Sequence, residues 1–227
     1  MLELKNVNKS YLEGNIKHTV LSNLNLHVSN GEIIILFGKS GSGKSTLLNI
    51  ISGIDVPDNG SVLIDGTDIT TLSEKERTLV RRNKVGFIFQ FFNLIPTLTV
   101  KENLLLPLEL TGTNNTEERI NSILSEVGLA NRAITYPDKL SGGEQQRIAI
   151  ARALVHNPHI ILADEPTGNL DYETGLQIID LLDRVVKKKE KTMIMVTHSK
   201  DVIGLADKIY SLKEGRLKEV KKESVFE

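Results

Sequence analysis

The segment Gly38–Ser45 carries the residues with the clearest chemistry. It reads Gly-Lys-Ser-Gly-Ser-Gly-Lys-Ser and matches the pattern G-x-x-x-x-G-K-[ST]. Glycines let backbone N–H groups converge on phosphate oxygens, while Lys44 reaches the β- and γ-phosphates and Ser45 binds Mg²⁺. The strand-like run Ile33–Phe37 precedes the loop and the helical pattern Thr46–Ile54 follows it, which is the context that this motif requires. The sequence therefore predicts a loop that binds the phosphates of a nucleotide.

Two adjacent carboxylates, Asp164 and Glu165, follow a second apolar run, Ile160–Ala163. Open α/β sheets bind their ligands at the carboxyl ends of strands, so both side chains are expected at the ligand-binding edge of a sheet. Asp164 would hold Mg²⁺ directly or through water, and Glu165 would orient or deprotonate the attacking water. The alternative is an acidic pair that only stabilises the N-terminus of a helix.

Ser141, Gly142 and Gly143 precede the helical pattern Ile148–Val155 and form a third motif. Small residues at the start of a helix leave backbone N–H groups accessible to an anion. A kinase or GTPase with a single site has no need of a second cradle of this kind. The alternative is that Ser141 is an ordinary helix N-cap followed by a loop.

Gln90 and His198 each follow an apolar run, Val85–Phe89 and Met193–Val196 respectively. The carboxyl ends of parallel strands share one sheet edge, which would bring both side chains near the carboxylates. The Gln90 amide can accept at a metal and donate towards water, and His198 can contact the γ-phosphate or the attacking water. The alternatives are a polar strand end for Gln90 and a locally bonded imidazole for His198.

The elements that must position these groups fall into two classes of strand. The four apolar runs are continuous, which indicates strands covered on both faces, as in a parallel α/β sheet. Shorter strand-like pieces near the N-terminus indicate an antiparallel layer, with Asn59-Gly60 among its predicted turns. These pieces are Leu2–Val7, Val20–Val28 and Ser61–Ile64.

Helical patterns lie between and after the strands. Residues 99–128 are predicted to be helical, with Pro107 limiting one helix and Gly128 ending another. A further helix is predicted from Asp171 to about Lys189, where apolar residues recur at helical spacing.

Composition bounds the possible classes of protein. The chain has 227 residues, of which 40% are apolar and 25% charged, as in an ordinary folded domain. The net charge of −1 gives no bulk field for a polyanion, so nucleic acid is not an expected partner. There is no Cys, which excludes disulfides and thiolate metal sites, and no apolar stretch approaches the length that spans a bilayer.

The segment Leu140–Arg147, Leu-Ser-Gly-Gly-Glu-Gln-Gln-Arg, resembles the signature sequence of ATP-binding cassette (ABC) ATPases. The other motifs occur in the order of that family, from Gly38–Ser45 as Walker A to Ile160–Glu165 as Walker B. The resemblance implies an α/β P-loop NTPase core with a mostly parallel sheet and flanking helices, plus an N-terminal antiparallel β subdomain and an α-helical subdomain. It implies one cassette over 1–227, with the core and β layer at about 1–90 and 155–227 and the helical subdomain at about 91–154.

The resemblance also implies roles for individual residues. Tyr11 would stack on adenine and Asp171 would lie in the D-loop near the dimer seam. The implied ATP-binding residues are Tyr11, Gly38, Lys39, Ser40, Gly41, Ser42, Gly43, Lys44, Ser45, Thr46, Ser141, Gly142, Gly143 and Asp171. The implied catalytic residues are Lys44, Gln90, Glu165 and His198, and the implied Mg²⁺ ligands are Ser45, Gln90 and Asp164. Taken alone, Tyr11 is also consistent with a packed strand aromatic.

The mechanism implied by the family is dimeric. Two chains would sandwich two ATP molecules, each held by the phosphate loop of one protomer and by Ser141 and Gly143 of the other. ATP would favour the closed dimer, and hydrolysis would open it by charge repulsion and loss of bridging contacts. Two positions depart from the family pattern: Lys39 where an uncharged residue is usual, and Ser199 where Asp is common.

The segment after Gln90 is similar to the MacB, LolD and FtsE group, including relatives of the Bce and Ytr types. This implies an ATPase that powers an exporter or extrusion complex at the cytoplasmic face of the membrane, with a separate MacB-like permease. The alternative is an FtsE-like ATPase that regulates envelope or cell-wall processes without transport. Phe91, Phe92, Leu94 and Ile95 would form the apolar patch that docks the permease, or else be buried in the helical subdomain.

Overall fold

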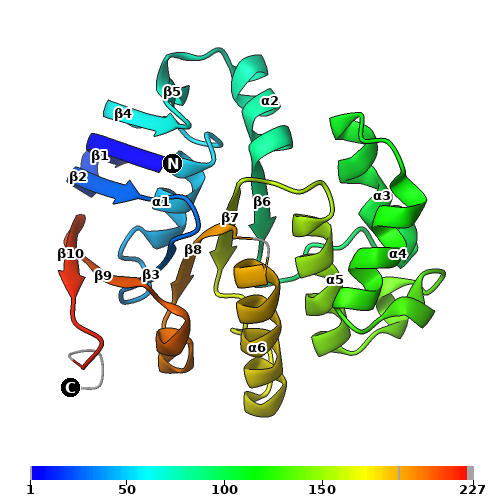
Figure 1. Cartoon of the computed structure of the whole chain (residues 1–227). Coiled ribbons are helices and arrows are strands. Elements are labelled where there is room, and N and C mark those ends of the chain that lie inside the picture. The colour runs from blue at the N-terminus through cyan, green and yellow to red at the C-terminus, as the bar shows by residue number, and fades with distance from the viewer. Residues whose placement is uncertain (1, 189, 224–227) are drawn as a thin grey trace. The chain divides into compact units, whose positions relative to one another are not determined.

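The computed structural model describes residues 2–188 and 190–223. Contacts between residues divide the chain into two compact units. The first unit is built from both ends of the chain, up to Arg81 and from Thr192, and the second from the residues between them (Figure 1). Within the described residues, none of the helices combines the length and the apolar character needed to cross a membrane.

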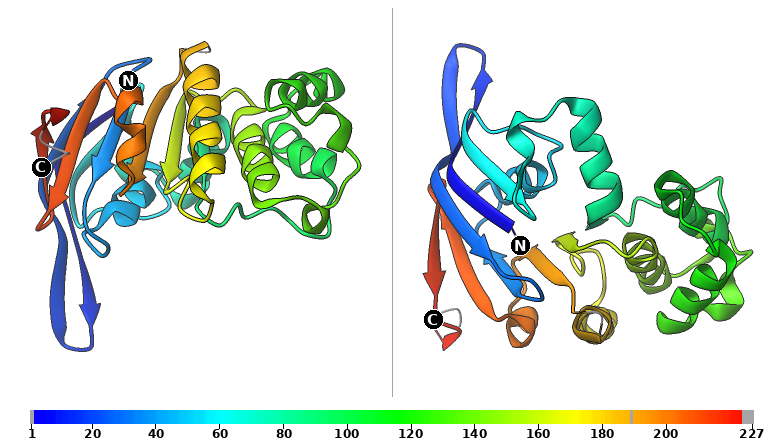
Figure 2. Two further views of the ribbon diagram at one scale, coloured as in Figure 1. Left: turned by 90° about the horizontal axis from the view of Figure 1, so that it is seen from below. Right: turned by 45° about the horizontal axis from the view of Figure 1, so that its top comes forward.

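The first unit contains a four-stranded antiparallel sheet in the order β2-β1-β4-β5. The strands are β1 (Leu2–Glu13), β2 (Ile16–Val28), β4 (Asn59–Ile64) and β5 (Thr67–Asp68). Leu2 and Leu4 are buried whereas Lys5 is exposed, as expected where one face of a sheet packs on a core. The β1–β2 hairpin continues beyond the other strands of the sheet, as Figure 2 shows in dark blue. The predicted antiparallel layer is therefore present.

One predicted turn in this layer is wrong. Asn59-Gly60 lies inside β4, where Asn59 pairs with Asn8 of β1 across an irregular register. Gly60 has a φ of 93°, and a Cβ at this position would lie 2.5 Å from the carbonyl oxygen of Asn6. The glycine thus allows two strands to approach closely at a bulge, a role that its local sequence does not distinguish from a turn.

The same unit contains the central parallel strands. β3 (Ile33–Phe37) lies between β8 (Thr192–Thr197) and β9 (Lys208–Lys213) and is parallel to both, and β10 (Arg216–Val220) is antiparallel to β9. Every residue of β8 is buried, which confirms that continuous apolarity marks a strand covered on both faces. The helices are α1 (Lys44–Ile51) and α2 (Glu74–Lys84). The boundary between the two units, after Arg81, lies within α2. Short 3₁₀ helices lie at Ile69–Thr71 and Lys200–Leu205.

The second unit pairs two parallel strands with four helices. The strands are β6 (Val85–Ile88) and β7 (Ile160–Asp164), and the helices are α3 (Val100–Thr111), α4 (Thr116–Glu126), α5 (Gly142–Leu154) and α6 (Tyr172–Lys188). Short 3₁₀ helices lie at Ala130–Arg132 and Pro137–Lys139. α5 is central because it packs against α3, α4, α6 and β6. The end predicted for α6, Lys189, lies outside the described residues.

Pro107 does not limit a helix, contrary to the prediction. It lies inside α3, which begins with a capping box between Thr99 and Glu102 and continues to Thr111. Proline removes one hydrogen-bond donor, but the buried face of α3 that includes Leu104 and Leu108 outweighs this loss. By contrast, Gly128 has a φ of 75° and follows α4, as the sequence predicts.

Gly86 of β6 generates a prediction about stability. A Cβ at Gly86 would lie 2.2 Å from the carbonyl oxygen of Ala153 in α5, so β6 and α5 must separate to accommodate it. We expect Gly86→Ala to lower the free energy of unfolding by about 1–3 kcal/mol, the usual cost of overpacking. Urea unfolding measures this change. The control is Gly204→Ala, since nothing lies within 4 Å of a Cβ at Gly204. Equal stabilities of the two variants would contradict the proposed close packing.

Candidate functional site

The predicted phosphate loop joins β3 to α1 in the first unit. Gly41 and Gly43 have φ values of 76° and 97°, a left-handed conformation that favours glycine. Gly43 is the N-cap of α1 and supplies no side-chain hydrogen bond to the first turn of that helix. The side chain of Lys44 turns back into the loop, where its Nζ donates to the carbonyl oxygens of Gly38 (2.9 Å) and Lys39 (3.1 Å). This ammonium is therefore held inside the loop, with the residue only 8% exposed.

The loop fits a phosphate chain for two reasons. Neighbouring residues pack closely against it, and glycines leave its backbone without side chains at positions where a phosphate must come close. A Cβ at Gly38 would lie 2.6 Å from the Ser42 hydroxyl, and a Cβ at Gly43 would lie 2.6 Å from Val20. The Ser42 hydroxyl is itself buried without a hydrogen-bond partner among the described residues. Backbone N–H groups at a helix N-terminus, an ammonium group and hydroxyl groups form the donor set that phosphates require.

Tyr11 lies in β1 and is brought to the same part of the first unit. Its hydroxyl donates to Asp55 Oδ2 (2.6 Å), and the residue is 42% exposed. Burial and this hydrogen bond raise the pKa of Tyr11, whereas a hydrogen bond with the side chain of Thr46, in the first turn of α1, opposes the rise. The predicted base-stacking residue therefore lies beside the helix that carries the phosphate loop.

His198 and the phosphate loop follow two paired strands, β8 and β3, that end in register with each other. β3 and β8 are parallel, and Phe37 is aligned with Thr197, the residues directly before Gly38 and His198. His198 is exposed. The next residue, Ser199, accepts from Asp201 N–H through Oγ and so caps a 3₁₀ helix, a role that Asp would also fill. Lys39, the other departure from the family pattern, is exposed.

The second unit repeats this arrangement with different residues. β6 and β7 are parallel, and Ile88 is aligned with Ala163, so Gln90 and the pair Asp164-Glu165 emerge at one edge. Gln90 Nε2 donates to Asn169 Oδ1 (3.2 Å), and Asn169 Nδ2 donates to Gln90 O (3.0 Å). These reciprocal bonds hold the Gln90 side chain against the loop that follows β7.

Glu165 has a strained backbone, with a φ of 47°. Non-glycine residues in this region carry a cost of about 1–3 kcal/mol and gather at functional sites. Sequence reasoning missed a residue that supports this loop: Gln146, in α5, is fully buried and donates through Nε2 to the carbonyl oxygen of Pro166 (2.7 Å). The only sign of this role in the sequence is that Gln146 is a polar residue in the first turns of the helix that continues through the apolar positions of Ile148–Val155.

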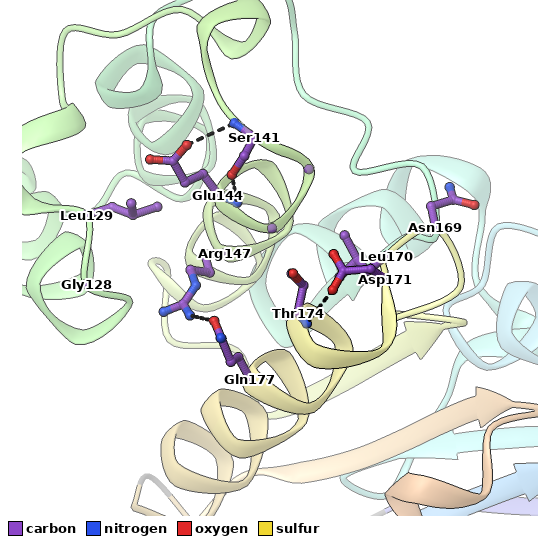
Figure 3. A pocket seen from close by; sticks show the side chains of 12 residues that line it. Gly128, Leu129, Ser141, Glu144, Arg147, Asn169, Leu170, Asp171, Thr174 and Gln177 are labelled. Carbon is purple, nitrogen blue, oxygen red and sulfur yellow. Dashed lines mark hydrogen bonds between the residues drawn. The ribbon is translucent and has the colours of Figure 1, made fainter.

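The small-residue motif lies at the N-terminus of α5. Ser141 and Glu144 form a capping box, in which Ser141 Oγ accepts from Glu144 N–H and Glu144 accepts from Ser141 N–H (Figure 3). This bond from the Ser141 backbone, together with Arg132, keeps the pKa of Glu144 below its usual value. Gly143 permits contact with α6, because a Cβ there would lie 2.5 Å from Thr174. The N-cap alternative is therefore present in the structure, and it leaves the role of Ser141 towards an anion as a prediction.

Ser141, Gly142 and Gly143 line a pocket of about 530 Å³ together with Asp171 and residues of α6. Figure 3 shows Asp171 at the start of α6, where its Oδ1 accepts from Thr174 N–H (3.0 Å). This bond lowers the pKa of Asp171, which favours its charged form. The signature motif and the D-loop residue predicted from the sequence thus share one cavity within the second unit.

The predicted docking residues follow Gln90. Phe91 is 72% exposed, Ile95 is 39% exposed, and Phe92 and Leu94 are half-buried, so none of the four is buried. Arg152 of α5 donates to the carbonyl oxygens of Asn93 (2.6 Å) and Phe92 (3.0 Å), and burial lowers its pKa. Sequence reasoning missed Arg152, because an arginine in a helix gives no local sign of a partner 60 residues away.

The structure thus collects the predicted residues into two groups. Lys44 with its loop, Tyr11 and His198 lie in the first unit. Gln90, Asp164, Glu165, Ser141 and Asp171 lie in the second. Each group lies at strand or helix ends, where backbone groups and side chains are available to a ligand.

Comparison with known proteins supports the prediction of an ABC ATPase. The ABC transporter family model matches residues 21–168. The ATP-binding protein LolD of the lipoprotein-releasing system of Rickettsia bellii is 45% identical over 96% of this chain and 97% of its own length. The macrolide export ATP-binding/permease protein MacB of Syntrophobacter fumaroxidans is 40% identical over 95% of this chain but only 31% of its own length.

A solved structure shows the same fold. The cassette MJ0796 of Methanocaldococcus jannaschii, in a dimeric post-hydrolysis state bound to ADP and Pi, has a TM-score of 0.89 and 44% identity, covering 98% of this chain and 99% of that one. The predicted fold class, an α/β P-loop cassette with an antiparallel β layer and helices, is therefore confirmed. The protein belongs to the ABC transporter family and is an ATP-binding ATPase cassette related to LolD and MacB.

Proposed function

We propose that the protein binds and hydrolyses ATP as a homodimer and powers an exporter or extrusion complex of the LolD and MacB type. The observation that carries the proposal is the aligned exit of Gly38 and His198 from β3 and β8, together with the register of β6 and β7, which brings Gln90 level with Glu165 just after Asp164 ends β7. Parallel pairing supports a nucleotide site at the carboxyl ends of these strands, where open α/β sheets bind their ligands. The names of the relatives support the transport role.

The chain's own residues divide the work on ATP. The loop Gly38–Ser45, continued by Thr46, binds the phosphates, with Lys44 compensating the charge of the β- and γ-phosphates. Glu165 accepts a proton from the attacking water, and Gln90 and His198 orient that water. Ser45, Asp164 and Gln90 would hold Mg²⁺ through oxygen atoms, and the bound ion would neutralise charge that develops on the phosphates.

Each ATP would be shared between two protomers. Ser141, Gly142 and Gly143 at the start of α5 would bind the γ-phosphate held by the phosphate loop of the partner, with Asp171 near the seam. The pocket beside these residues and the dimeric relative support this proposal. ATP then stabilises the closed dimer by its differential affinity for that state, and hydrolysis removes the contact.

The membrane partner would be a separate MacB-like permease, reached from the cytoplasmic face. LolD is named as the ATP-binding protein of a system, whereas MacB combines ATP-binding and permease functions in one longer chain. The exposed apolar side chains Phe91 and Ile95, with Phe92 and Leu94, would contact the permease. The helical subdomain at about 91–154 would carry this surface, and the core and β layer at about 1–90 and 155–227 would bind nucleotide.

The first test concerns the general base. Glu165→Gln keeps the size of the side chain but cannot accept the proton, so we expect ATP turnover to fall by at least about 100-fold. ATP binding should persist, and the ATP-bound dimer should accumulate. Phosphate release and light scattering measure these two quantities. Glu118→Gln, an exposed residue in the first turn of α4, is the matched control. Turnover of Glu165→Gln at the parental rate would refute the assignment.

The second test asks whether the sites are shared. Lys44→Ala disables the phosphate loop, and Ser141→Asp retains a good N-cap while it repels the γ-phosphate. Each variant alone should be inactive. In a mixture, a heterodimer contains one site with both an intact Lys44 and an intact Ser141 from the partner, so ATP hydrolysis should reappear. An inactive mixture, shown by native mass spectrometry to contain the heterodimer, would indicate that each site uses one chain only.

The third test concerns the permease. Phe91 is 72% exposed, so Phe91→Glu should fold normally yet place a charge in an apolar interface. We expect less of the variant to copurify with a coexpressed permease, while the isolated chain hydrolyses ATP at the parental rate. Leu12→Glu, at a residue 76% exposed in β1, is the control. Equal copurification of both variants would place the docking surface elsewhere.

A further inference from the structure

Residues 55–58, which follow α1, are bonded to residues 8–11 of β1. Lys9 Nζ donates to Asp55 Oδ1 (2.6 Å) and to Val56 O (2.7 Å), and the Tyr11 hydroxyl donates to Asp55 Oδ2 (2.6 Å). Asp58 adds two bonds to the backbone of β1, since Ser10 N donates to Asp58 Oδ2 (2.8 Å) and Asp58 N donates to Asn8 O (2.8 Å). One carboxylate of this segment, Asp55, thus holds the Tyr11 side chain, while the other holds only backbone.

Asp55 is also fixed to the helix that carries the phosphate loop. Its backbone N–H donates to the Asn49 carbonyl oxygen (3.1 Å), and Ile54 N–H donates to the same oxygen (2.9 Å). Asn49 lies in α1, whose first residue is Lys44. A helix of this length is a rigid rod of about 12 Å. The Tyr11 hydroxyl is therefore linked to the phosphate loop through Asp55 and one short helix.

The charge state of Asp55 suits this role. Burial alone would raise its pKa, but hydrogen bonds from Lys9, Tyr11 and the Val56 N–H outweigh burial and lower it, so the carboxylate is ionised at neutral pH. The Lys9 side chain is only 11% exposed, so this ion pair is screened less than a surface pair. A hydrogen bond from a phenol to a carboxylate is stronger than one between neutral groups.

The Tyr11 ring has one occupied face. Lys9 Nζ lies over the ring, 5.1 Å from its centroid, a cation–π distance. The residue is nevertheless 42% exposed, so part of the ring surface remains accessible. The pairing of β1 with β4 ends at Asn8, so Tyr11 lies in the part of the hairpin where β1 pairs with β2 alone among the described strands, opposite His18.

We propose that Asp55, supported by Lys9, is a positioning residue that orients the Tyr11 ring to receive the base of the nucleotide. The ring is held in one orientation before binding, at a separation from the phosphate loop that α1 sets. The inference rests on the proposed role of Tyr11 in stacking on adenine. Preorganisation reduces the ordering cost of binding, for which we expect about a 3- to 10-fold effect on affinity.

The test compares two ligands in calorimetric titrations. A non-hydrolysable ATP analogue, adenylyl imidodiphosphate, requires the base platform and the phosphate loop, whereas inorganic tripolyphosphate requires only the loop. We expect Tyr11→Phe and Asp55→Ala each to weaken binding of the analogue by about 3- to 10-fold and to leave tripolyphosphate binding unchanged. The double variant should be no weaker than either single variant, because both remove the same hydrogen bond.

Asp58→Ala is the matched control, since Asp58 joins the same two segments without touching Tyr11. Equal losses of analogue affinity in Asp55→Ala and Asp58→Ala would show a merely structural role and overturn the inference. Parental affinity in Tyr11→Phe would overturn it as well. Asp55→Asn, which keeps the volume of the side chain, replaces Asp55→Ala if circular dichroism shows that the alanine variant does not fold.

Tyr11→Ala separates this inference from the proposed function. If Tyr11→Ala weakens binding of the analogue while Tyr11→Phe does not, the ring is the platform and only its positioning by Asp55 is refuted. If Tyr11→Ala binds the analogue like the parent, the stacking role of Tyr11 fails and the inference fails with it. Retained tripolyphosphate binding in every variant shows that the phosphate loop is intact.

Discussion

The parallel pairing of strands is the constraint on which the candidate site depends. β3 and β8 end at the same level, and β6 ends one residue before β7, because parallel hydrogen bonding fixes the register of each pair. Residues that follow paired strands therefore lie at the same level however distant they are in the sequence, as Gly38 does with His198 and Gln90 with Glu165. The contribution of the buried apolar strands to the candidate site is that they hold the residues at their carboxyl ends in register.

Backbone conformation is the second determinant. Gly41 and Gly43 adopt positive φ values in the loop that leads into α1, and Glu165 adopts one directly after β7. A glycine accepts this geometry without steric cost, but a glutamate does so only when its surroundings impose it. The supports are visible in the second unit, where Gln146 binds the Pro166 carbonyl and Gln90 pairs with Asn169. The fixed dipoles and donors of such loops are what a charged transition state requires.

A third feature is the use of buried and half-buried polar side chains to hold loops. Asn103 of α3, fully buried, donates to the carbonyl oxygens of Ile95, Leu98 and Thr99, and the half-buried Arg152 of α5 donates to those of Phe92 and Asn93. Buried polar groups must be paired because an unpaired one is costly, so each bond also fixes the loop that supplies the acceptor. The segment after Gln90 is thereby held at both ends by helices of its own unit. In the first unit, Asp55 does the same for the side chain of Tyr11.

The sequence by itself determined the family and the four continuous apolar strands, and it predicted the residues that we propose to act on ATP. Glycine spacing in Gly38–Ser45, the acidic pair after Ile160–Ala163 and the small residues at Ser141–Gly143 are local patterns, and continuous apolar runs identify strands covered on both faces. Only the tertiary structure decided that Pro107 lies within a helix, that Gly60 lies in a bulge, that Gln146 and Arg152 bind the carbonyl groups of loops, and that Asp55 binds the Tyr11 hydroxyl. The physical reason is that these outcomes depend on partners distant in sequence: a buried face that outweighs one lost hydrogen bond, a neighbouring strand, and carbonyl or hydroxyl groups that folding alone brings within hydrogen-bonding distance.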